Sequence, residues 1–419
     1  MGNVFRQAVE VGIRVRLSQD GRIPKGSFAA PFPIQGAGND DGPTVRPPLT
    51  DNPIQEGHEV LWQPNGNLPA HPVTVPDRDA CRQREKAGCA SAVAHKVALM
   101  RTLVLGGTSF VGRAIVEDAL DRGDEVTIFT RGQTGPALFP GVERRIGDRS
   151  SGNYSALAAG SWDAVVDVSG YVPRHVGQAA NALGDRIGRY LFISTGSVYG
   201  RLGGPDAIAE DAPRLPSERD TEEITGDTYG PLKVACEDDV LARYGEQGTV
   251  VRPGIVAGPH DPTDRFTWWV RRAARGGRVA LPARPDQPAQ VVDSRDLARL
   301  VTSLLADDRP GVYNAVGPAE PTTLAGLVHA CAAGAGTTIA VVPVLPDAVR
   351  PTLPLVLTDS TWDVIFRRSA VKARAAGLPA TPLATTAADV LAWDRERGQP
   401  PLGVELAPER EAELLAAAG

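Results

Sequence analysis

A glycine-containing turn between a short apolar run and an amphipathic segment constrains this chain more than any other feature. Thr102–Leu105 is apolar and β-prone, and Val111–Leu120 has the spacing of an amphipathic helix. The turn between them reads G-x-x-S-x-x-G: Gly106 comes first, Ser109 replaces the usual middle glycine, and Gly112 comes last. A strand, glycine turn and helix in this order bind a dinucleotide pyrophosphate at the helix N-terminus. A structural turn without a ligand is the alternative.

Further apolar runs continue the alternation of strands and helices along the chain. Three of them are predicted to be strands: Glu125–Thr130, Asp163–Val168 and Arg189–Ser194. The middle run is nearly all apolar, as expected for a strand buried on both faces of a parallel sheet. The predicted fold class is therefore α/β, a Rossmann-type doubly wound parallel sheet with a smaller mixed C-terminal substrate domain.

Two positions bear on which dinucleotide binds: one directly after the strand Glu125–Thr130, and one after a short apolar-ended run that precedes Gly147. Arg131 follows Glu125–Thr130, where NAD-specific proteins usually carry a carboxylate for the ribose hydroxyls. A guanidinium suits a 2′-phosphate, so NADP is favoured over NAD, and a solvated loop arginine is the alternative. Asp148 is expected either beside the adenine, where it accepts a hydrogen bond from the amino group, or as a cap of the next helical segment.

Tyr229 and Lys233 form a Y-x-x-x-K pattern on a predicted helix that continues over Val234–Tyr244. Residues four apart share a helix face, so the phenol and the ammonium are expected to be neighbours. A phenol has a pKa of about 10, and a nearby cation lowers it by favouring the phenolate. Such a tyrosine can exchange a proton with a substrate hydroxyl or ketone while hydride passes to or from nicotinamide. Thr195, which follows the strand Arg189–Ser194, is expected to hold the substrate oxygen. Taken alone, the pattern also fits an ordinary surface helix.

From Met100 to about Trp393 the chain resembles the extended and atypical short-chain dehydrogenase/reductases, a group often described as NAD-dependent epimerases/dehydratases. The matching segments, in order, are LVLGGTSFVG, FTRG, GDR, STGSVYG, YGPLK, VVRPGIVAGP, VVDSRDLARLV and VYNAVGP. The resemblance implies Tyr229 as general acid/base, Lys233 as a ribose ligand that modifies the pKa of the tyrosine, and Thr195 in the serine/threonine place. It also implies two groups of cofactor-binding residues: Gly106, Thr108, Ser109, Phe110, Val111 and Gly112 around the pyrophosphate, and Arg131, Asp148 and Arg149 on the adenosine side.

Departures from the family pattern narrow the expected activity. Sugar-nucleotide dehydratases carry an Asp-Glu pair after the threonine, whereas this chain has Gly196 and Ser197, which cannot supply that proton transfer. The glycine loop, FTRG, GDR and the D-x-x-G of Asp167–Gly170 are most similar to a subgroup that includes the chloroplast stem-loop-binding proteins. Those proteins are associated with RNA and look to have lost the active-site tyrosine, but this chain keeps both Tyr229 and Lys233.

The resulting expectation is an NAD(P)-dependent oxidoreductase or epimerase that acts on a hydroxyl or ketone of a small molecule, with sugars and nucleotide sugars among the candidates. The alternative is a non-catalytic dinucleotide-binding or RNA-associated protein on the same fold. A formal net charge of −6 argues against a general nucleic-acid partner. The cysteines lack C-x-x-C spacing, and no metal is expected. Without an apolar run of membrane-spanning length or a signal peptide, a cytoplasmic protein with no membrane partner is expected. The resemblance adds a homodimer.

The chain is expected to divide into three parts. Residues 1–99 are rich in Pro, Gly, Asn and Asp and are expected to be a disordered or mis-assigned N-terminal extension, with a small partner-binding arm as the alternative. Residues 100–259 are the predicted dinucleotide-binding Rossmann domain. Residues 260–419 are the predicted substrate-binding or capping region, with some segments returning to the Rossmann sheet. In this last part, Trp268 and Trp269 are expected to pack in the core rather than line a pocket, and a catalytic role of the lone His260 is not favoured.

Overall fold

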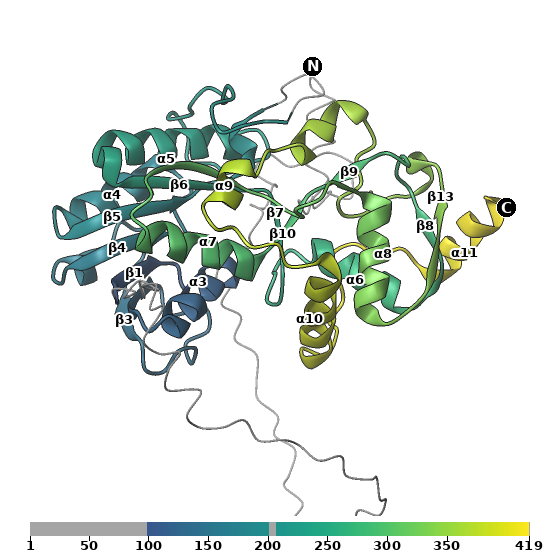
Figure 1. Ribbon diagram of the computed structural model, residues 1–419, viewed down its shortest axis with the longest axis horizontal. Coiled ribbons are helices and arrows are strands. Elements are labelled where there is room, and N and C mark those ends of the chain that lie inside the picture. The colour runs from purple at the N-terminus through teal and green to yellow at the C-terminus, as the bar shows by residue number, and fades with distance from the viewer. Residues whose placement is uncertain (1–98, 201–206, 419) are drawn as a thin grey trace, which may run out of the picture. The chain divides into compact units, whose positions relative to one another are not determined.

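A seven-stranded parallel sheet is the largest element of the structure (Figure 1). The computed structural model describes residues 99–200 and 207–418, so the expectation for residues 1–98 lies outside the described residues. The sheet order is β3-β2-β1-β4-β5-β6-β11. Its strands are β1 (Arg101–Leu105), β2 (Glu125–Thr130), β3 (Glu143–Ile146), β4 (Trp162–Asp167), β5 (Ile187–Ile193), β6 (Gly248–Pro253) and β11 (Gly311–Ala315). The order reverses between β1 and β4, as in doubly wound folds, and the predicted fold class is confirmed.

Alternating side chains of the central strands build two cores, one on each face of the sheet. Val104 and Val166 face one core, which contains side chains of α3 (Phe110–Asp121) and α7 (Ser294–Ala306). Leu105 and Val165 face the other core together with α4 (Pro173–Leu183) and α5 (Tyr229–Tyr244). Burial on both faces explains why these strands read as continuous apolar runs in the sequence.

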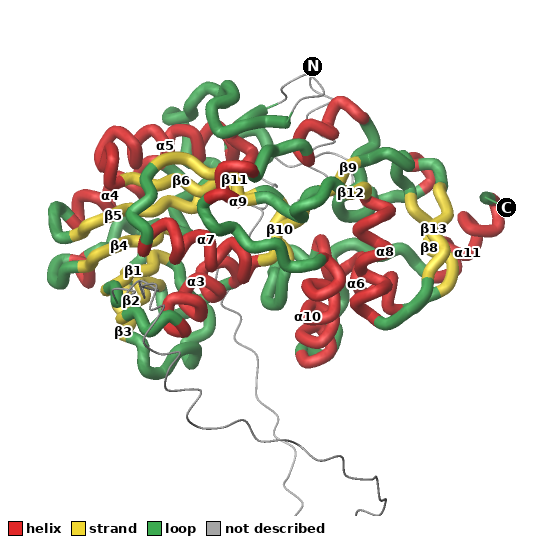
Figure 2. The backbone as a smooth tube through the Cα atoms, in the orientation of Figure 1, coloured by secondary structure: helices red, strands yellow, loops and turns green. Residues whose placement is uncertain are grey.

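Most of the remaining strands and helices form a third core beyond the carboxyl ends of the large sheet (Figure 2). Its strands pair as β7 (Ile255–Ala257) with β10 (Val291–Asp293), β8 (Gly277–Leu281) with β13 (Ile339–Pro343), and β9 (Pro288–Ala289) with β12 (Thr322–Thr323). Its helices are α6 (Arg265–Ala274), α8 (Leu324–Ala335), α10 (Leu383–Glu396) and α11 (Pro408–Ala417), and the short α9 (Val371–Ala375) packs against β11. Trp268 and Trp269 are buried in this core, so the packing interpretation of both residues is confirmed.

Five single-turn or short 3-10 helices connect these elements within the described residues: η1 (Ser155–Leu157), η2 (Gly196–Val198), η3 (Gly245–Gln247), η4 (Pro346–Ala348) and η5 (Ser360–Phe366). The sheet does not end where the sequence-predicted domain boundary lies, because both β11 and the helix α7, which packs against α3 on one face of the sheet, come after residue 259. No helix in the described part of the chain is long and apolar enough to cross a membrane. Nor do His, Cys, Asp and Glu residues of that part gather into a group that could hold a metal ion.

Candidate active site

The glycine turn after β1 lets the start of α3 approach the backbone of the turn closely. Gly106 has φ +101°, a conformation that favours glycine, and a Cβ there would lie 3.0 Å from the Ser169 side chain. A Cβ on Gly112 would overlap the carbonyl oxygen of Gly106, so only glycine allows the helix to approach the strand so closely. The helix begins at Phe110, and the Ser109 side chain makes no capping hydrogen bond. The first N–H groups of α3 are therefore left for a ligand, as a pyrophosphate site requires.

The other predicted loop residues contribute backbone rather than side chains. Thr108, Phe110 and Val111 are buried, and the last two belong to the core under α3. Ser109 is exposed. Any contact that these buried residues make to a pyrophosphate would therefore come from their N–H groups.

Arg131 and Asp148 lie after adjacent strands, as the sequence predicts. Arg131 directly follows β2 and is exposed. Asp148 follows β3, and its Oδ1 accepts a hydrogen bond from the N–H of Ser150 at 2.9 Å, while its backbone pairs with Asn153. This local bond closes a turn and caps no helix, because the next helical segment, Ser155–Leu157, begins after Tyr154.

Arg149 does not lie where the resemblance implies, because its guanidinium is committed to protein acceptors. It is buried and binds both carboxylate oxygens of Asp167, at 2.5 and 2.8 Å. Its remaining N–H groups donate to Ser169, Tyr154 and the carbonyl of His175, so all five donors are used. Burial raises the pKa of Asp167, but the charge and hydrogen bonds of Arg149 outweigh it and hold that pKa below its usual value. The adenosine role expected for Arg149 is therefore corrected to a structural one.

The structure brings Thr195 and Tyr229 together from two elements. Thr195 follows β5 and caps η2, where its Oγ1 accepts a hydrogen bond from the N–H of Ser197 at 3.1 Å. Tyr229 is the first residue of α5, and its phenol lies near enough to the Thr195 side chain for that side chain to act on its pKa. A phenol and a hydroxyl that meet at the carboxyl edge of a parallel sheet stand where ligands bind in such folds.

Lys233 lies one turn further along α5 and is buried to 2% exposure. Its Nζ donates to the carbonyl oxygens of Gly170, at 2.9 Å, and Ile193, at 2.7 Å, and lies 4.1 Å from the centre of the Phe192 ring. An ammonium has three N–H groups, so one donor is left by these two bonds. Burial lowers the pKa of Lys233 to about 8, although nearby Cys236 acts to raise it.

The pKa of Tyr229 corrects one expectation from the Y-x-x-x-K pattern. Burial raises this pKa to about 12, and the hydrogen bond from Thr195 and the charge of Arg265 act in the opposite direction. Lys233 is not among the groups that shift it. The physical reason is the direction of the ammonium, which points to the backbone carbonyls after β4 and on β5 instead of the phenol.

A second buried network holds the segment that carries Thr195, and the sequence analysis did not identify it. Glu237 is fully buried and accepts hydrogen bonds from Ser194 at 2.5 Å and from two nitrogens of Arg252 at 2.9 and 2.7 Å. Arg252 also donates to the hydroxyl of Tyr199, which donates in turn to Asn314. One feature of the sequence could have indicated this network: Glu237 lies four residues after Lys233 and so on the same helix face.

The position of the Arg368 side chain explains why Thr195 is followed by a glycine, Gly196. It comes after η5 and donates to the carbonyls of Gly196 at 2.8 Å and Ile365 at 2.7 Å. A Cβ on Gly196 would overlap the guanidinium, so neither an aspartate nor any other side chain fits there without displacing Arg368. Burial lowers the pKa of Arg368 to about 10. A cation therefore stands where the sugar-nucleotide dehydratases of the resemblance carry an acid.

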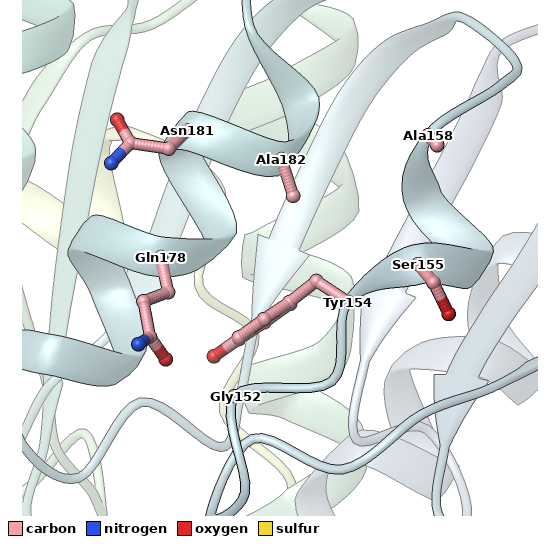
Figure 3. Close-up of a pocket in the computed structure, with 7 residues that line it drawn as sticks. All are labelled: Gly152, Tyr154, Ser155, Ala158, Gln178, Asn181 and Ala182. Carbon is pink, nitrogen blue, oxygen red and sulfur yellow. The ribbon is translucent and has the colours of Figure 1, made fainter.

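Other features lie outside this constellation. His260 packs edge-on against Trp393, with ring centres 5.4 Å apart, and Asp296 accepts two hydrogen bonds from Thr381. A hollow of about 340 Å³ lies between η1 and α4. Tyr154 and Gln178 are among its lining residues (Figure 3). None of the predicted catalytic residues lines it, so we assign the site from the side-chain geometry at the sheet edge and not from this hollow.

Comparison with known proteins agrees with the resemblance. Residues 163–315 match the NAD dependent epimerase/dehydratase family. The chloroplast stem-loop binding protein of 41 kDa b from Arabidopsis thaliana is 26% identical over 253 residues, which cover 56% of this chain and 63% of that protein. A 3-beta-hydroxysteroid dehydrogenase from Mycolicibacterium neoaurum is 29% identical over 194 residues, 39% of this chain and 50% of that protein. The chain thus spans less than two thirds of these relatives' length.

Solved structures show the same fold. A putative epimerase from Burkholderia cenocepacia superposes with a TM-score of 0.55 at 21% identity, covering 70% of this chain and 98% of its own. A UDP-glucose 4-epimerase gives a TM-score of 0.54 at 18% identity, covering 72% and 99%. A dTDP-glucose 4,6-dehydratase from Bacillus anthracis, solved with NAD, gives 0.54 at 17% identity, covering 72% and 98%. The resemblance to the extended short-chain dehydrogenase/reductases is confirmed.

Proposed function

We propose that this chain, which carries an NAD-dependent epimerase/dehydratase domain, is an NAD(P)-dependent oxidoreductase or epimerase acting on a hydroxyl or ketone of a small molecule. The observation that carries the proposal is the approach of the Tyr229 phenol to the Thr195 side chain at the sheet edge, with Lys233 buried one helical turn away. Sugars and nucleotide sugars are the proposed substrate class, because structures with this fold include a UDP-glucose 4-epimerase.

The residues around the sheet edge fit a dinucleotide. The close approach at Gly112 and the unpartnered start of α3 form a cradle for a pyrophosphate. Arg131 is exposed beyond β2, where a 2′-phosphate of NADP would reach it, and Lys233 keeps one N–H for a ribose hydroxyl. A bound nicotinamide would supply a hydride donor or acceptor.

Thr195 and Tyr229 would handle the proton of the substrate oxygen. Because the pKa of Tyr229 is about 12, its phenol is protonated at neutral pH and can donate to a carbonyl oxygen. In the opposite direction the phenolate must accept a proton, and the Thr195 hydrogen bond and the Arg265 charge favour that form. Thr195 would hold the substrate oxygen beside the phenol.

The Tyr229→Phe variant tests the proposal because it removes only the phenolic hydroxyl. We expect turnover of a responsive substrate, followed by the nicotinamide absorbance with UDP-glucose and a set of small ketones, to fall by about 10²–10⁴-fold. The thermal shift caused by the dinucleotide should persist. Tyr313→Phe is the matched control: Tyr313 lies on the far strand β11, and within residues 99–200 and 207–418 its hydroxyl bonds only to the carbonyl of Pro310. Full activity of Tyr229→Phe would refute the assignment.

A second candidate function rests on the similarity to the chloroplast stem-loop binding protein. In that case the chain would bind RNA without turnover. RNA affinity would then fall steeply with salt concentration, because phosphate contacts release counterions, and Tyr229→Phe would leave it unchanged. A filter-binding series between 50 and 200 mM salt separates the two functions.

A further inference from the structure

Ser169 joins the end of β4 to the glycine turn that follows β1. Its Oγ donates a hydrogen bond to the carbonyl oxygen of Leu105 at 3.0 Å, and Leu105 directly precedes Gly106. The backbone N–H of Val168 donates to the same carbonyl at 3.1 Å. A Cβ on Gly106 would come within 3.0 Å of the Ser169 side chain, so these two residues are also in close contact. The position of Ser169 therefore bears directly on the shape of the turn.

The buried guanidinium of Arg149 holds Ser169 from the other side. Its Nη1 donates to Ser169 Oγ at 3.0 Å. The hydroxyl can accept this bond because its own proton is given to the carbonyl of Leu105, so the two bonds run in one direction from Arg149 to the start of the glycine turn. The backbone N–H of Ser169 is held as well, by Oδ1 of Asp167 at 3.1 Å. Arg149 and Asp167 together thus fix both the side chain and the backbone of Ser169.

The Arg149–Asp167 pair is itself fixed on several sides. Arg149 binds both carboxylate oxygens of Asp167, and Oδ2 of Asp167 accepts a further hydrogen bond from the hydroxyl of Tyr190 at 2.6 Å. Asp167 is fully buried, and Arg149 is 8% exposed. A bidentate arginine–carboxylate pair sets the relative orientation of its two groups, and burial strengthens each of its hydrogen bonds. The pair can therefore impose a defined position on Ser169.

The next residue, Gly170, carries the same end of β4 to Lys233. Its carbonyl oxygen accepts a hydrogen bond from Lys233 Nζ at 2.9 Å, and a Cβ on Gly170 would come within 2.9 Å of Asp167 Oδ2. The stretch from Asp167 to Gly170 thus touches two places that the proposed function assigns to the dinucleotide. These are the glycine turn, for the pyrophosphate, and Lys233, for a ribose hydroxyl.

We infer that Arg149 is a positioning residue for the dinucleotide, which acts through Asp167 and Ser169 to set the glycine turn that would hold the pyrophosphate. The inference rests on the proposed function and identifies the buried residues that shape its cofactor site. Arg149 does not itself reach the dinucleotide, because all five of its N–H donors bond to protein acceptors. A positioning role differs from a contribution to stability alone, because it predicts weaker dinucleotide binding by a chain that is still folded.

The test compares two serines at opposite ends of β4 in the full chain. Ser169→Ala removes the hydroxyl between Arg149 and the glycine turn and keeps the Arg149–Asp167 pair. Ser161→Ala is the matched control, because Ser161 Oγ also accepts a hydrogen bond from an arginine, Arg101 at 3.1 Å, at the exposed amino end of the strand. Calorimetric titration gives the Kd for NADP⁺ and for ADP-ribose, which has the pyrophosphate but neither the nicotinamide nor the 2′-phosphate. We expect Ser169→Ala to weaken both Kd values by about three- to tenfold and Ser161→Ala to leave them unchanged.

Arg149→Met removes the first member of the same chain of hydrogen bonds. If it melts cooperatively without ligand, its Kd for ADP-ribose should be weakened at least as much as that of Ser169→Ala. The double variant should then bind no more weakly than Arg149→Met alone, because both changes interrupt one chain of bonds. If Arg149→Met does not fold, Ser169→Ala decides by itself.

Each outcome decides the inference. Wild-type affinity of Ser169→Ala, or of a folded Arg149→Met, for ADP-ribose overturns it and leaves the proposed function standing. A lower melting temperature with an unchanged Kd identifies a purely structural role and also overturns it. So do a loss seen with NADP⁺ alone, which would place the effect away from the pyrophosphate, and losses that add in the double variant. A wild type that binds neither ligand refutes the proposed function and the inference together.

Discussion

The buried ammonium of Lys233 in the candidate site lowers the stability of the folded chain. Its ammonium is almost completely removed from water, and its partners are two neutral carbonyl groups instead of a carboxylate. Its pKa falls from 10.5 to about 8, so protonated Lys233 destabilises the folded chain relative to the unfolded one.

The free-energy cost of burying protonated Lys233 predicts how the stability of the folded chain changes with pH. Below pH 8 both states are protonated and the full cost, roughly 3 kcal/mol, is present. Between pH 8 and 10.5 the unfolded state binds more protons than the folded state, so stability rises with pH. We therefore expect the free energy of unfolding of the wild type, minus that of Lys233→Met, to increase over this window in denaturant titrations. A difference that stays flat from pH 7 to 10.5 would contradict the buried, unpaired state of Lys233.

The buried Arg149–Asp167 pair differs from Lys233, because each of its charges is stabilised by the opposite charge of its partner. Arg149→Met should lower the free energy of unfolding by about 3–5 kcal/mol, because it leaves the Asp167 carboxylate buried without a counter-ion. Arg101→Met is the matched control. Its partner Asp163 lies on the same strand as Asp167, but that pair is exposed to solvent and should contribute little. Equal effects of the two substitutions in urea unfolding would argue against the burial of the first pair.

At the scale of elements, the packing of α3 on β1 carries the dinucleotide cradle. Gly112→Ala places a methyl group against the carbonyl of Gly106 and should push the helix away. We expect a loss of about 1–3 kcal/mol in unfolding free energy and loss of the thermal shift caused by dinucleotide. Gly177→Ala in α4 is the control, because its Cβ meets nothing within 4 Å and should stabilise by about 0.5–1 kcal/mol. A dinucleotide shift retained in Gly112→Ala would place the ligand elsewhere.

Local sequence patterns predicted the presence of strands and helices better than the residues at which they begin and end. The strand Glu125–Thr130 has its predicted bounds, since alternation and flanking polar residues mark both ends. The strand predicted over Arg189–Ser194 instead runs from Ile187 to Ile193. The helix expected to carry Tyr229 and Lys233 runs from Tyr229 to Tyr244, so that the phenol sits at its first position.

At the scale of the whole molecule, the order of strands decides where the site can form. The sheet reverses direction between β1 and β4, and the carboxyl ends of β1, β4 and β5 carry the glycine turn, Gly170 and Thr195. A segment beyond the sheet then brings Arg368 to the same edge, where it donates to the carbonyl of Gly196.

The position of Arg131 predicts which dinucleotide the molecule prefers. We expect NADP⁺ to raise the melting temperature more than NAD⁺ at equal concentration, because a 2′-phosphate gains the exposed guanidinium. Arg131→Ala should remove this difference and leave the NAD⁺ shift intact. A larger shift with NAD⁺ in the wild type would exclude Arg131 as a phosphate ligand.

The sequence by itself determined the features that depend on neighbours along the chain. The period of apolar residues predicted the parallel sheet, the glycine spacing predicted the turn at the start of α3, and helical spacing predicted that Tyr229 and Lys233 share one helix. These features follow from backbone geometry within a few residues.

Only the tertiary structure decided which charges meet. Arg149 faces Asp167 instead of the adenosine side, Lys233 points to backbone carbonyls, and Arg368 contacts Gly196 across 172 residues of sequence. Contacts between residues so far apart produce no repeating pattern along the sequence. Seen alone, each partner cannot be distinguished from an ordinary solvent-exposed arginine or a loop glycine. Burial then sets their pKa values, and burial is a property of the packed molecule as a whole.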